Sequence, residues 1–481
     1  MYTLMQISDL HRASAGALSN DELLSGLTAD NERYKKEHPP IPSVDAIIIT
    51  GDLVQGLPLG SVDYPSELER QYAEAYEFIA KLADAFVQGD HSRVVIVPGN
   101  HDIDYQIALQ SMTPLPKARK NVRQLLELPD SLYRWSWDDL QLFKIDNLDM
   151  YDDRLKFFCR LYDQFYKDSK LATKPDAKQS FNQFELDQGK ILVTAYDSCT
   201  KVDCFNSNAE IQPQAIAQSH LDCLKNYLLK IAVWHHDVQG PARRSDYVDL
   251  DSVQLMIDKG YRLGLHGHWH KSEAVPYTLH TFEDDTMVVI SAGSLCAPPS
   301  QLPEGLKRQY NIIQILDSYC EAKIHIREMA IPGIFAPGRL ISRGNRSYAD
   351  VQWKNPPPSP FLNLGSGGTN IKLVDKIEQL VMFRSYDEAI RLIEDNRSNL
   401  GHYGRQLLSK VLFIAKRWEP LISLLSDPAN PDELSKLMIA RIELKQWKEY
   451  ERDLEKAEKS GQFPHGLITA CREKLNAEKR I

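Results

Sequence analysis

The sequence predicts an α/β fold whose functional site lies where its strands end. Residues 93–97 form an apolar, β-branched run that stops at Pro98-Gly99, as a buried strand does when it opens into a loop. A long segment with helical periodicity, residues 64–87, separates this run from an earlier one at residues 45–50, which gives the order strand, helix, strand. Five predicted strand ends are followed by Asp, Asn or His side chains, which are groups that bind metal ions.

The composition is typical of a soluble globular protein with one large core and a smaller domain. The 481 residues are 43% hydrophobic and 26% charged, with a formal net charge of −9. This charge disfavours non-specific attachment to nucleic acid, although a local basic groove would still permit a nuclease. Seven cysteines without framework spacing favour free thiols in a reducing compartment. Because the first strand begins at the N-terminus and no apolar run could span a membrane, we expect a cytoplasmic protein without membrane contact.

The first predicted strand, residues 2–8, ends in Asp9-Leu10-His11. Alternation along an extended backbone places Asp9 and His11 on one side, so both can face one ion. Taken alone, an Asp-x-His pair is more often a surface turn. Arg12 follows directly, where it either faces an incoming phosphate or is solvated.

The next two strands lead to the central candidates. Residues 45–50 are apolar without alternation, which indicates burial on both faces, and they end in Gly51-Asp52. Residues 93–97 lead into a loop with Asn100, His101 and Asp102, which offer an amide oxygen, an imidazole and a carboxylate in succession.

Residues 103–190 interrupt the series of strands and are rich in aromatic side chains. We expect a mainly helical insertion that stands beside the site as a cap. Most of its aromatic residues are expected to pack the insertion onto the main core rather than to contact a ligand.

Two later strands end in histidines. Residues 190–196 resume the sheet, residues 229–234 lead to His235-His236, and residues 261–265 lead to a motif that contains His268 and His270. Three further strands are expected to complete a second sheet, and a loop between them to border the site. These strands are residues 286–291, 310–316 and 322–328, and the loop is residues 293–308.

The last third of the chain differs in character, and we divide the chain into a catalytic domain (1–332), a linker (333–369) and a helical domain (370–481). The linker is predicted from its Pro-rich (355–360) and Gly-rich (365–368) stretches. In the helical domain an aromatic residue opens a helix about every 30 residues, close to the spacing of tetratricopeptide-type hairpins. We expect a degenerate helical repeat that docks a partner protein or another copy of the chain, with a plain helical bundle as the alternative.

Together the strand ends predict a site for two divalent metal ions. Paired ions need a bridging carboxylate and further oxygen and nitrogen ligands. The sequence offers Asp9, His11, Asp52, Asn100, His235, His268 and His270. Two carboxylates leave a surplus of positive charge on two divalent ions, which attracts an anionic phosphoester and lowers the pKa of a bound water. A thiolate-rich set would instead indicate structural zinc.

The ordered series Asp-x-His, Gly-Asp, Gly-Asn-His-Asp, His and Gly-His-x-His resembles that of the calcineurin-like metallophosphoesterases over residues 1–330. The resemblance implies a four-layer αββα sandwich of two mixed sheets flanked by helices. It implies one metal ion held by Asp9, His11, Asp52 and His270, and a second held by Asp52, Asn100, His235 and His268. His235 is preferred to His236 because the family's ligand is the first where two histidines stand together. Manganese is the expected metal, with iron or zinc as alternatives.

The resemblance also implies a catalytic role for His101, and its neighbour Asp102 is a second catalytic candidate. His101 would contact the phosphate and help to protonate the leaving oxygen, while a water activated between the ions attacks phosphorus in line. Asp102 would either orient His101 or cap the following helix.

The substrate implied is a phosphodiester. Protein phosphatases of this family carry an arginine shortly after Gly-Asp and a glutamate after Asn-His, whereas residues 51–56 read GDLVQG and residues 100–102 read NHD. The sequence is nearer to the cyclic-nucleotide phosphodiesterases and the DNA-repair exonucleases. The insertion and the helical domain favour a phosphodiesterase of nucleic acid or a nucleotide within a larger assembly. The alternatives are a small-molecule or cyclic-nucleotide phosphodiesterase and a non-catalytic scaffold, which the complete ligand set disfavours.

Overall fold

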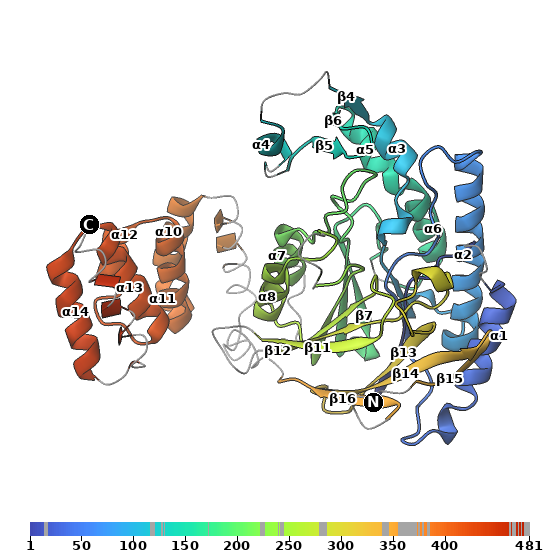
Figure 1. The fold of residues 1–481 in the computed structure, drawn as a ribbon. Helices are drawn as coiled ribbons and strands as arrows, with labels where there is room; N and C mark the ends of the chain where they lie inside the picture. The colour runs from blue at the N-terminus through green and yellow to red at the C-terminus, as the bar shows by residue number, and fades with distance from the viewer. Residues whose placement is uncertain are drawn as a thin grey trace. The chain divides into compact units, whose positions relative to one another are not determined.

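The computed structural model describes the chain except for residues 14–17, 116–120, 127, 129, 172, 222–226, 239, 241–244, 279–285, 339–345, 355–372, 374–375, 378–379, 382–384, 461–462, 464–467, 470, 473 and 476–481. The described residues belong to two compact units, residues 1–357 and 358–481 (Figure 1). Among the described helices, none is long and apolar enough to pass through a lipid bilayer.

Seven strands form the first sheet of the larger unit, in the order β15-β14-β13-β1-β2-β3, with β16 paired to β14. Their bounds are β1 Tyr2–Ile7, β2 Ala46–Ile49, β3 Val94–Ile96, β13 Gln309–Ile315, β14 Glu321–Ile331, β15 Ile334–Pro337 and β16 Tyr348–Gln352. Strands β1, β2 and β3 run parallel, so their carboxyl ends meet at one edge. All three are fully buried, as their continuous apolar pattern predicts.

Six strands form the second sheet, in the order β11-β12-β10-β9-β8-β7. Their bounds are β7 Phe181–Leu186, β8 Ile191–Tyr196, β9 Leu229–Val233, β10 Leu263–His266, β11 Glu273–Thr278 and β12 Thr286–Ser291. Strands β8, β9, β10 and β12 are parallel, and the edge strands β7 and β11 are antiparallel to their neighbours. The histidines that follow β9 and β10 therefore lie at the same edge of this sheet.

Helices cover the outer faces of both sheets (Figure 1). On the first sheet lie α1 Asn20–Asn31, α2 Tyr64–Val87 and α6 Lys156–Tyr166, and on the second lie α7 Pro213–Leu221 and α8 Leu250–Asp258. Helix α2 has the bounds that its periodicity predicts, and it buries Leu68, Tyr72, Ala75, Ile79 and Leu82, which recur at helical spacing. Side chains of both sheets share one core, which confirms the four-layer αββα arrangement. The short 3₁₀ turns are η1 Tyr34–Lys36, η2 His91–Arg93, η3 Asn100–Asp102, η4 Asp153–Leu155, η5 Asp187–Gly189 and η6 Pro299–Gln301.

Strands β13 and β14 correct one expectation, because they belong to the first sheet and not to the second. β13 pairs antiparallel with β1, opposing Leu4 with Ile313, and β14 follows it by a hairpin. Apolar patterning identifies a strand but carries no information about its partner, since a distant segment supplies the neighbouring hydrogen bonds.

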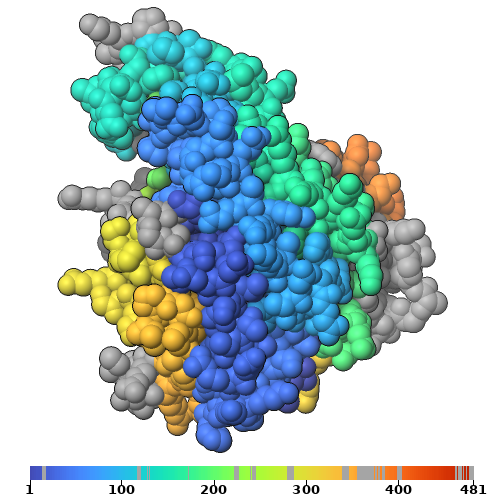
Figure 2. Space-filling view, turned by 90° about the vertical axis from the view of Figure 1, so that its right-hand side faces the viewer, coloured from blue at the N-terminus to red at the C-terminus, as the bar shows by residue number. Residues whose placement is uncertain are grey.

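The insertion is a second correction, because residues 103–190 are not mainly helical. They contain a three-stranded antiparallel sheet, β4-β6-β5, which projects at one end of the larger unit beside α2 (Figure 2). Its elements are α3 Tyr105–Gln110, β4 Met112–Pro114, α4 Val122–Leu126, β5 Tyr133–Ser136, β6 Gln141–Ile145 and α5 Leu148–Asp152. In β5 every second residue is buried, so the local period is that of a strand. As expected, aromatic residues of α6 pack into the main core: Phe157, Phe158, Tyr162, Phe165 and Tyr166.

The predicted linker begins too early. Strands β15 and β16 lie within residues 333–352 and extend the first sheet. Trp353 follows β16 as a buried side chain whose indole N–H donates to the backbone oxygen of Tyr319 at 3.0 Å. The Pro-rich and Gly-rich stretches on which the linker prediction rests, 355–360 and 365–368, lie outside the described residues.

The smaller unit is helical, with α10 Tyr386–Asp395, α11 Arg397–Ile414, α12 Trp418–Leu424, α13 Pro431–Glu443 and α14 Trp447–Ser460 around its own apolar core. The turns after α11 and α13 are alike. Lys416 and Lys445 both have φ 54°, and each stands two residues before the tryptophan that opens the next helix. This recurrence agrees with two similar hairpins, and the helical repeat stays a prediction.

A buried ionic cluster ties α1 to the first sheet. Asp30 accepts hydrogen bonds from Arg327 Nε at 2.8 Å and Nη2 at 2.6 Å, and from the Tyr310 hydroxyl at 2.5 Å. The side chains of Asp30 and Arg327 are 0% and 2% exposed, so the charge of each is compensated by the other rather than by water.

Asp30→Ala should therefore lower the free energy of unfolding of the larger unit by about 3–5 kcal/mol. The substitution removes the carboxylate that Arg327 Nε and Nη2 contact and leaves the buried guanidinium with Glu37 alone, which lies 3.1 Å from Nη1. Urea unfolding followed by circular dichroism measures the change. Glu69→Ala is the matched control, since Glu69 pairs with Arg160 at the surface, where such a pair contributes about 1 kcal/mol or less. Equal losses in the two variants would contradict the role given to the buried pair.

Candidate metal centre

The loops after β1 and β2 are held together by backbone hydrogen bonds at the carboxyl edge of the first sheet. Asp9 N–H donates to Gly51 O at 3.0 Å, and His11 N–H donates to Asp52 O at 3.1 Å. Asp9, His11 and Asp52 have φ of 51°, 40° and 53°, a left-handed conformation that is strained for residues with a Cβ. His268 and His270, after β10, have φ of 73° and 54°. Such strain concentrates at functional sites, where the surrounding structure holds it in place.

Four of the predicted ligands converge on one point. The Nε2 atoms of His11 and His270 are 3.3 Å apart, and His270 Nε2 lies 3.2 Å from Asp9 Oδ1. Asp52 Oδ2 lies 3.8 Å from His11 Nε2. These are the residues that the resemblance assigns to the first metal ion.

The other predicted ligands converge beside them. His235 Nε2 lies 3.3 Å from Asp52 Oδ2 and 3.1 Å from Asn100 Oδ1. His268 Nδ1 lies 3.0 Å from the same Asn100 oxygen. Asp52 Oδ2 thus borders both groups, and the structure brings all seven predicted ligands together.

Backbone carbonyls orient two of the imidazoles. His235 Nδ1 lies 2.6 Å from Thr50 O, and His270 Nδ1 lies 2.9 Å from Gln301 O. A carbonyl only accepts hydrogen bonds, so Nδ1 carries a proton in each ring and Nε2 faces the centre. The contact with Gln301 also places the loop 293–308 at the border of the site, as expected.

The donor set fits divalent cations. The centre is rich in hydrogen-bond acceptors, since imidazole nitrogens, an amide oxygen and two buried carboxylates point at one another. Positive charge at this place would stabilise them. Protons can meet this need: burial alone would lower the pKa of His235, but the Asp52 carboxylate raises it to about 9. Burial alone would raise the pKa of Asp9, but the neighbouring charge of His270 lowers it to about 2. A metal ion would replace these protons.

His101 lies beside the first group. Its ring centroid is 4.7 Å from that of His11, and its backbone N–H donates to Asp52 Oδ1 at 2.8 Å. His101 Nδ1 lies 2.7 Å from Gln55 O, which fixes the ring. One ligand atom each of His11, Asp52 and His101 lie within 4.8 Å of one another, so geometry alone also permits His101 as a ligand.

Asp102 takes neither of the two roles that the sequence left open. Its carboxylate accepts from the backbone N–H groups of Gly99 at 2.8 Å and Leu53 at 3.1 Å, and from the Tyr72 hydroxyl at 3.3 Å. The following helix, α3, is capped by Asp104 instead. Asp102 therefore joins the loops after β2 and β3, which supports a positioning role, and its assignment as a catalytic residue stays a prediction.

The two adjacent histidines have different surroundings. His236 is fully buried, and its Nδ1 lies 2.8 Å from the Ser198 hydroxyl, whereas His235 faces Asp52 and Asn100. This geometry supports the preference for His235.

Arg12 is neither solvated nor facing the centre. Its guanidinium is buried and donates to Glu74 Oε1 at 2.7 Å and to Leu18 O at 2.8 Å.

Asp246 is a neighbour of the centre that the sequence analysis did not predict. Its Oδ2 lies 3.4 Å from His268 Nε2. Asp246 stands in an irregular segment without a motif, so only the folded chain reveals it as a neighbour of the centre.

Comparison with known proteins identifies the family of the chain. The sequence profile of the calcineurin-like phosphoesterases matches residues 2–272. Similar solved structures include GAP50, an anchor in the inner membrane complex of Plasmodium (10% identity, 74% of this chain and 90% of that chain covered, TM-score 0.34). They also include the calcineurin-like phosphoesterase YfkN of Bacillus subtilis (12%, 73% and 90%, 0.29) and zinc-bound Vps29 of Entamoeba histolytica (11%, 73% and 99%, 0.27). No curated protein matches the chain. Because the profile covers more than half of its residues, this chain belongs to the calcineurin-like phosphoesterase family.

Proposed function

We propose that the protein is a cytoplasmic phosphodiesterase of nucleic acid or a nucleotide that depends on two divalent metal ions, with manganese as the first candidate. The observation that carries this proposal is the pair of ligand groups that share Asp52 Oδ2. The larger unit thus offers an acceptor-rich centre for two ions side by side, within a family of phosphoesterases.

Residues of both sheets would hold the ions. Asp9, His11 and His270 would hold one, and Asn100, His235 and His268 the other, with Asp52 between them. Two bound ions supply Lewis-acid stabilisation of phosphoryl oxygens and lower the pKa of water.

His101 would supply the proton that the leaving oxygen needs. The carbonyl of Gln55 holds its Nδ1, which leaves Nε2 for the substrate. The hydrogen bond from the His101 backbone N–H to Asp52 Oδ1 ties the loop after β3 to the loop after β2, which keeps this ring beside the centre.

Phosphodiesters are preferred to phosphoproteins because the loop after Asp52 carries no arginine in the position that protein phosphatases use. Residues 53–56 are Leu53, Val54, Gln55 and Gly56, and the backbone oxygen of Gln55 orients His101. A small-molecule or cyclic-nucleotide phosphodiesterase stays the second candidate, and a non-catalytic scaffold the third.

A substrate screen with added Mn²⁺ tests the proposal. Bis-p-nitrophenyl phosphate, cyclic nucleotides, single- and double-stranded DNA and RNA are compared with the monoester p-nitrophenyl phosphate. We expect diester hydrolysis that a chelator abolishes and Mn²⁺ restores. Hydrolysis of the monoester only, or hydrolysis that the chelator leaves unchanged, would contradict the proposal.

We further propose that the smaller unit docks a protein partner. Its helices form a separate core, and its described residues contain no group of metal-binding side chains. A chain that ends at Pro357 should keep hydrolysis of bis-p-nitrophenyl phosphate and lose the partner that co-purifies with the full chain. Loss of hydrolysis would instead assign the smaller unit to the catalytic body.

A further inference from the structure

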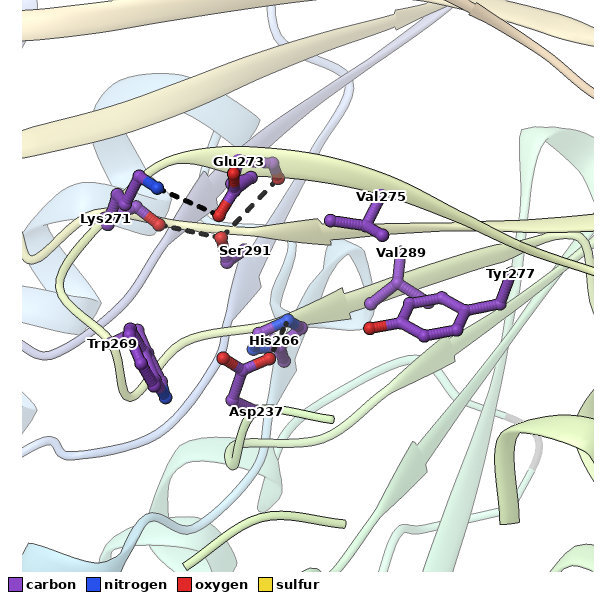
Figure 3. Close-up of a pocket in the computed structure, with 9 residues that line it drawn as sticks. All are labelled: Asp237, His266, Trp269, Lys271, Glu273, Val275, Tyr277, Val289 and Ser291. Carbon is purple, nitrogen blue, oxygen red and sulfur yellow. Dashed lines mark hydrogen bonds and ion pairs between the residues drawn. The ribbon is translucent and has the colours of Figure 1, made fainter. Parts of the chain in front are cut away.

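The larger unit has a depression, open to solvent, between the loop that follows β10 and the strands β11 and β12 (Figure 3). Its lining residues are distinct from the seven proposed metal ligands. The depression is nevertheless close to them in the chain, because Trp269 stands between His268 and His270, and Asp237 follows His235-His236.

Two aromatic side chains flank the depression. Trp269 and Tyr277 stand on opposite sides of it, with Asp237 and His266 between them (Figure 3). Trp269 is 42% exposed, although a tryptophan side chain is more stable when its ring is covered. The ring therefore offers a flat apolar face to a planar group, and stacking of a nucleobase on such a face contributes about 1–3 kcal/mol.

The polar groups of the depression favour a neutral ligand that donates hydrogen bonds. Two carboxylates, Asp237 and Glu273, face one lysine, Lys271, whose Nζ is paired with Glu273 at 3.1 Å. This balance repels a phosphate. Asp237 Oδ1 accepts from the Val238 N–H at 2.6 Å and lies 3.5 Å from His266 Nε2, which leaves Oδ2 able to accept from a ligand.

The depression is also linked to the metal centre by direct contacts. Asp237 forms a β-bridge with Tyr247, and the preceding residue, Asp246, reaches His268 Nε2 at 3.4 Å. His268 in turn contacts Asn100 in the second ligand group. His268 therefore joins the second ligand group to the chain segments that line the depression.

We infer that this depression binds the base of a nucleotide whose phosphate is held at the metal centre, and that it prefers bases with an amino group. The inference rests on the proposed function and specifies its substrate. Guanine, adenine and cytosine present amino N–H donors to the Asp237 carboxylate. Uracil presents one N–H between two carbonyl oxygens, which the carboxylate repels.

A series of esters with one leaving group tests the inference. The 5′-p-nitrophenyl phosphates of guanosine, adenosine, cytidine and uridine are compared with methyl p-nitrophenyl phosphate, which has no base. We expect kcat/KM for the three amino bases to exceed that for uridine and for the methyl ester by about tenfold or more. Trp269→Ala should lower kcat/KM for the amino bases by about 5- to 150-fold, the range that corresponds to one lost stacking contact. Asp237→Asn should reduce the preference over uridine.

Trp137→Ala is the matched control, because Trp137 is 80% exposed and lies in the insertion, outside the depression. It should leave the series unchanged. Equal kcat/KM for all five esters in the full chain, or equal responses of Trp269→Ala and Trp137→Ala, would overturn the base site while leaving the phosphodiesterase proposal intact. Release of no p-nitrophenol from any ester, the methyl ester included, would overturn the proposed function and this inference with it.

Discussion

Asp52→Asn is expected to remove both metal ions and to lower kcat/KM for a diester by about 10³-fold or more, which corresponds to about 4 kcal/mol of transition-state stabilisation. Its Oδ2 lies 3.8 Å from His11 Nε2 and 3.3 Å from His235 Nε2, so a single atom borders both ligand groups. The amide keeps the shape of the side chain but removes the negative charge between two cations. Elemental analysis of the purified protein and initial rates on bis-p-nitrophenyl phosphate measure the two effects.

Asn100→Ala separates the two ions. Asn100 Oδ1 contacts His235 at 3.1 Å and His268 at 3.0 Å, both in the second group. This variant should therefore retain the first ion and lose mainly the second.

The metal content of the Asp52→Asn protein can contradict the bridging role. If this variant binds both ions as well as the unchanged protein does, Asp52 is not the bridging ligand.

His101→Ala should keep both metal ions while turnover falls by about 10²–10⁴-fold, the range for a lost acid–base group. The ring lies beside the ligands and is oriented by the Gln55 carbonyl at 2.7 Å. The loss should be larger for a dinucleotide, whose alkoxide leaves poorly, than for bis-p-nitrophenyl phosphate, whose leaving group needs little protonation. Rates on the two diesters, measured beside the metal content, give this comparison.

The metal content of the His101→Ala protein decides between two roles. One ligand atom each of His11, Asp52 and His101 lie within 4.8 Å of one another, so a direct bond from His101 to a metal ion is the competing assignment. Loss of an ion would establish that assignment. An equal loss of rate on the two diesters, with both ions retained, would also count against proton donation.

The sequence determined the elements that depend on local periodicity and on side-chain chemistry. Residues 64–87 form the helix that their apolar spacing predicts, because one face must be buried. The donor atoms stand at the ends of β1, β2, β3, β9 and β10, where apolar runs stop and polar side chains begin. The seven ligands could therefore be predicted without knowing which strands pair in each sheet.

Tertiary structure alone decided what depends on distant parts of the chain. β13 joins β1 across about 300 residues, and β15 and β16 extend the same sheet beyond the predicted domain end. The hydrophobic pattern of a segment indicates which of its residues are buried. The strand with which it pairs depends on contacts with residues that are distant in the sequence.

The same reason explains the details of the site. Backbone carbonyls of Thr50, Gln55 and Gln301 orient three histidines, and a carbonyl leaves no mark in the sequence because every residue has one. The role of Asp102 was predicted from its neighbour His101, yet its carboxylate is held by backbone N–H groups of Leu53 after β2 and Gly99 after β3. Side-chain identity thus determined which groups could bind metal, and the fold determined how each group is held, because orientation is set by backbone atoms that only the folded chain brings within reach.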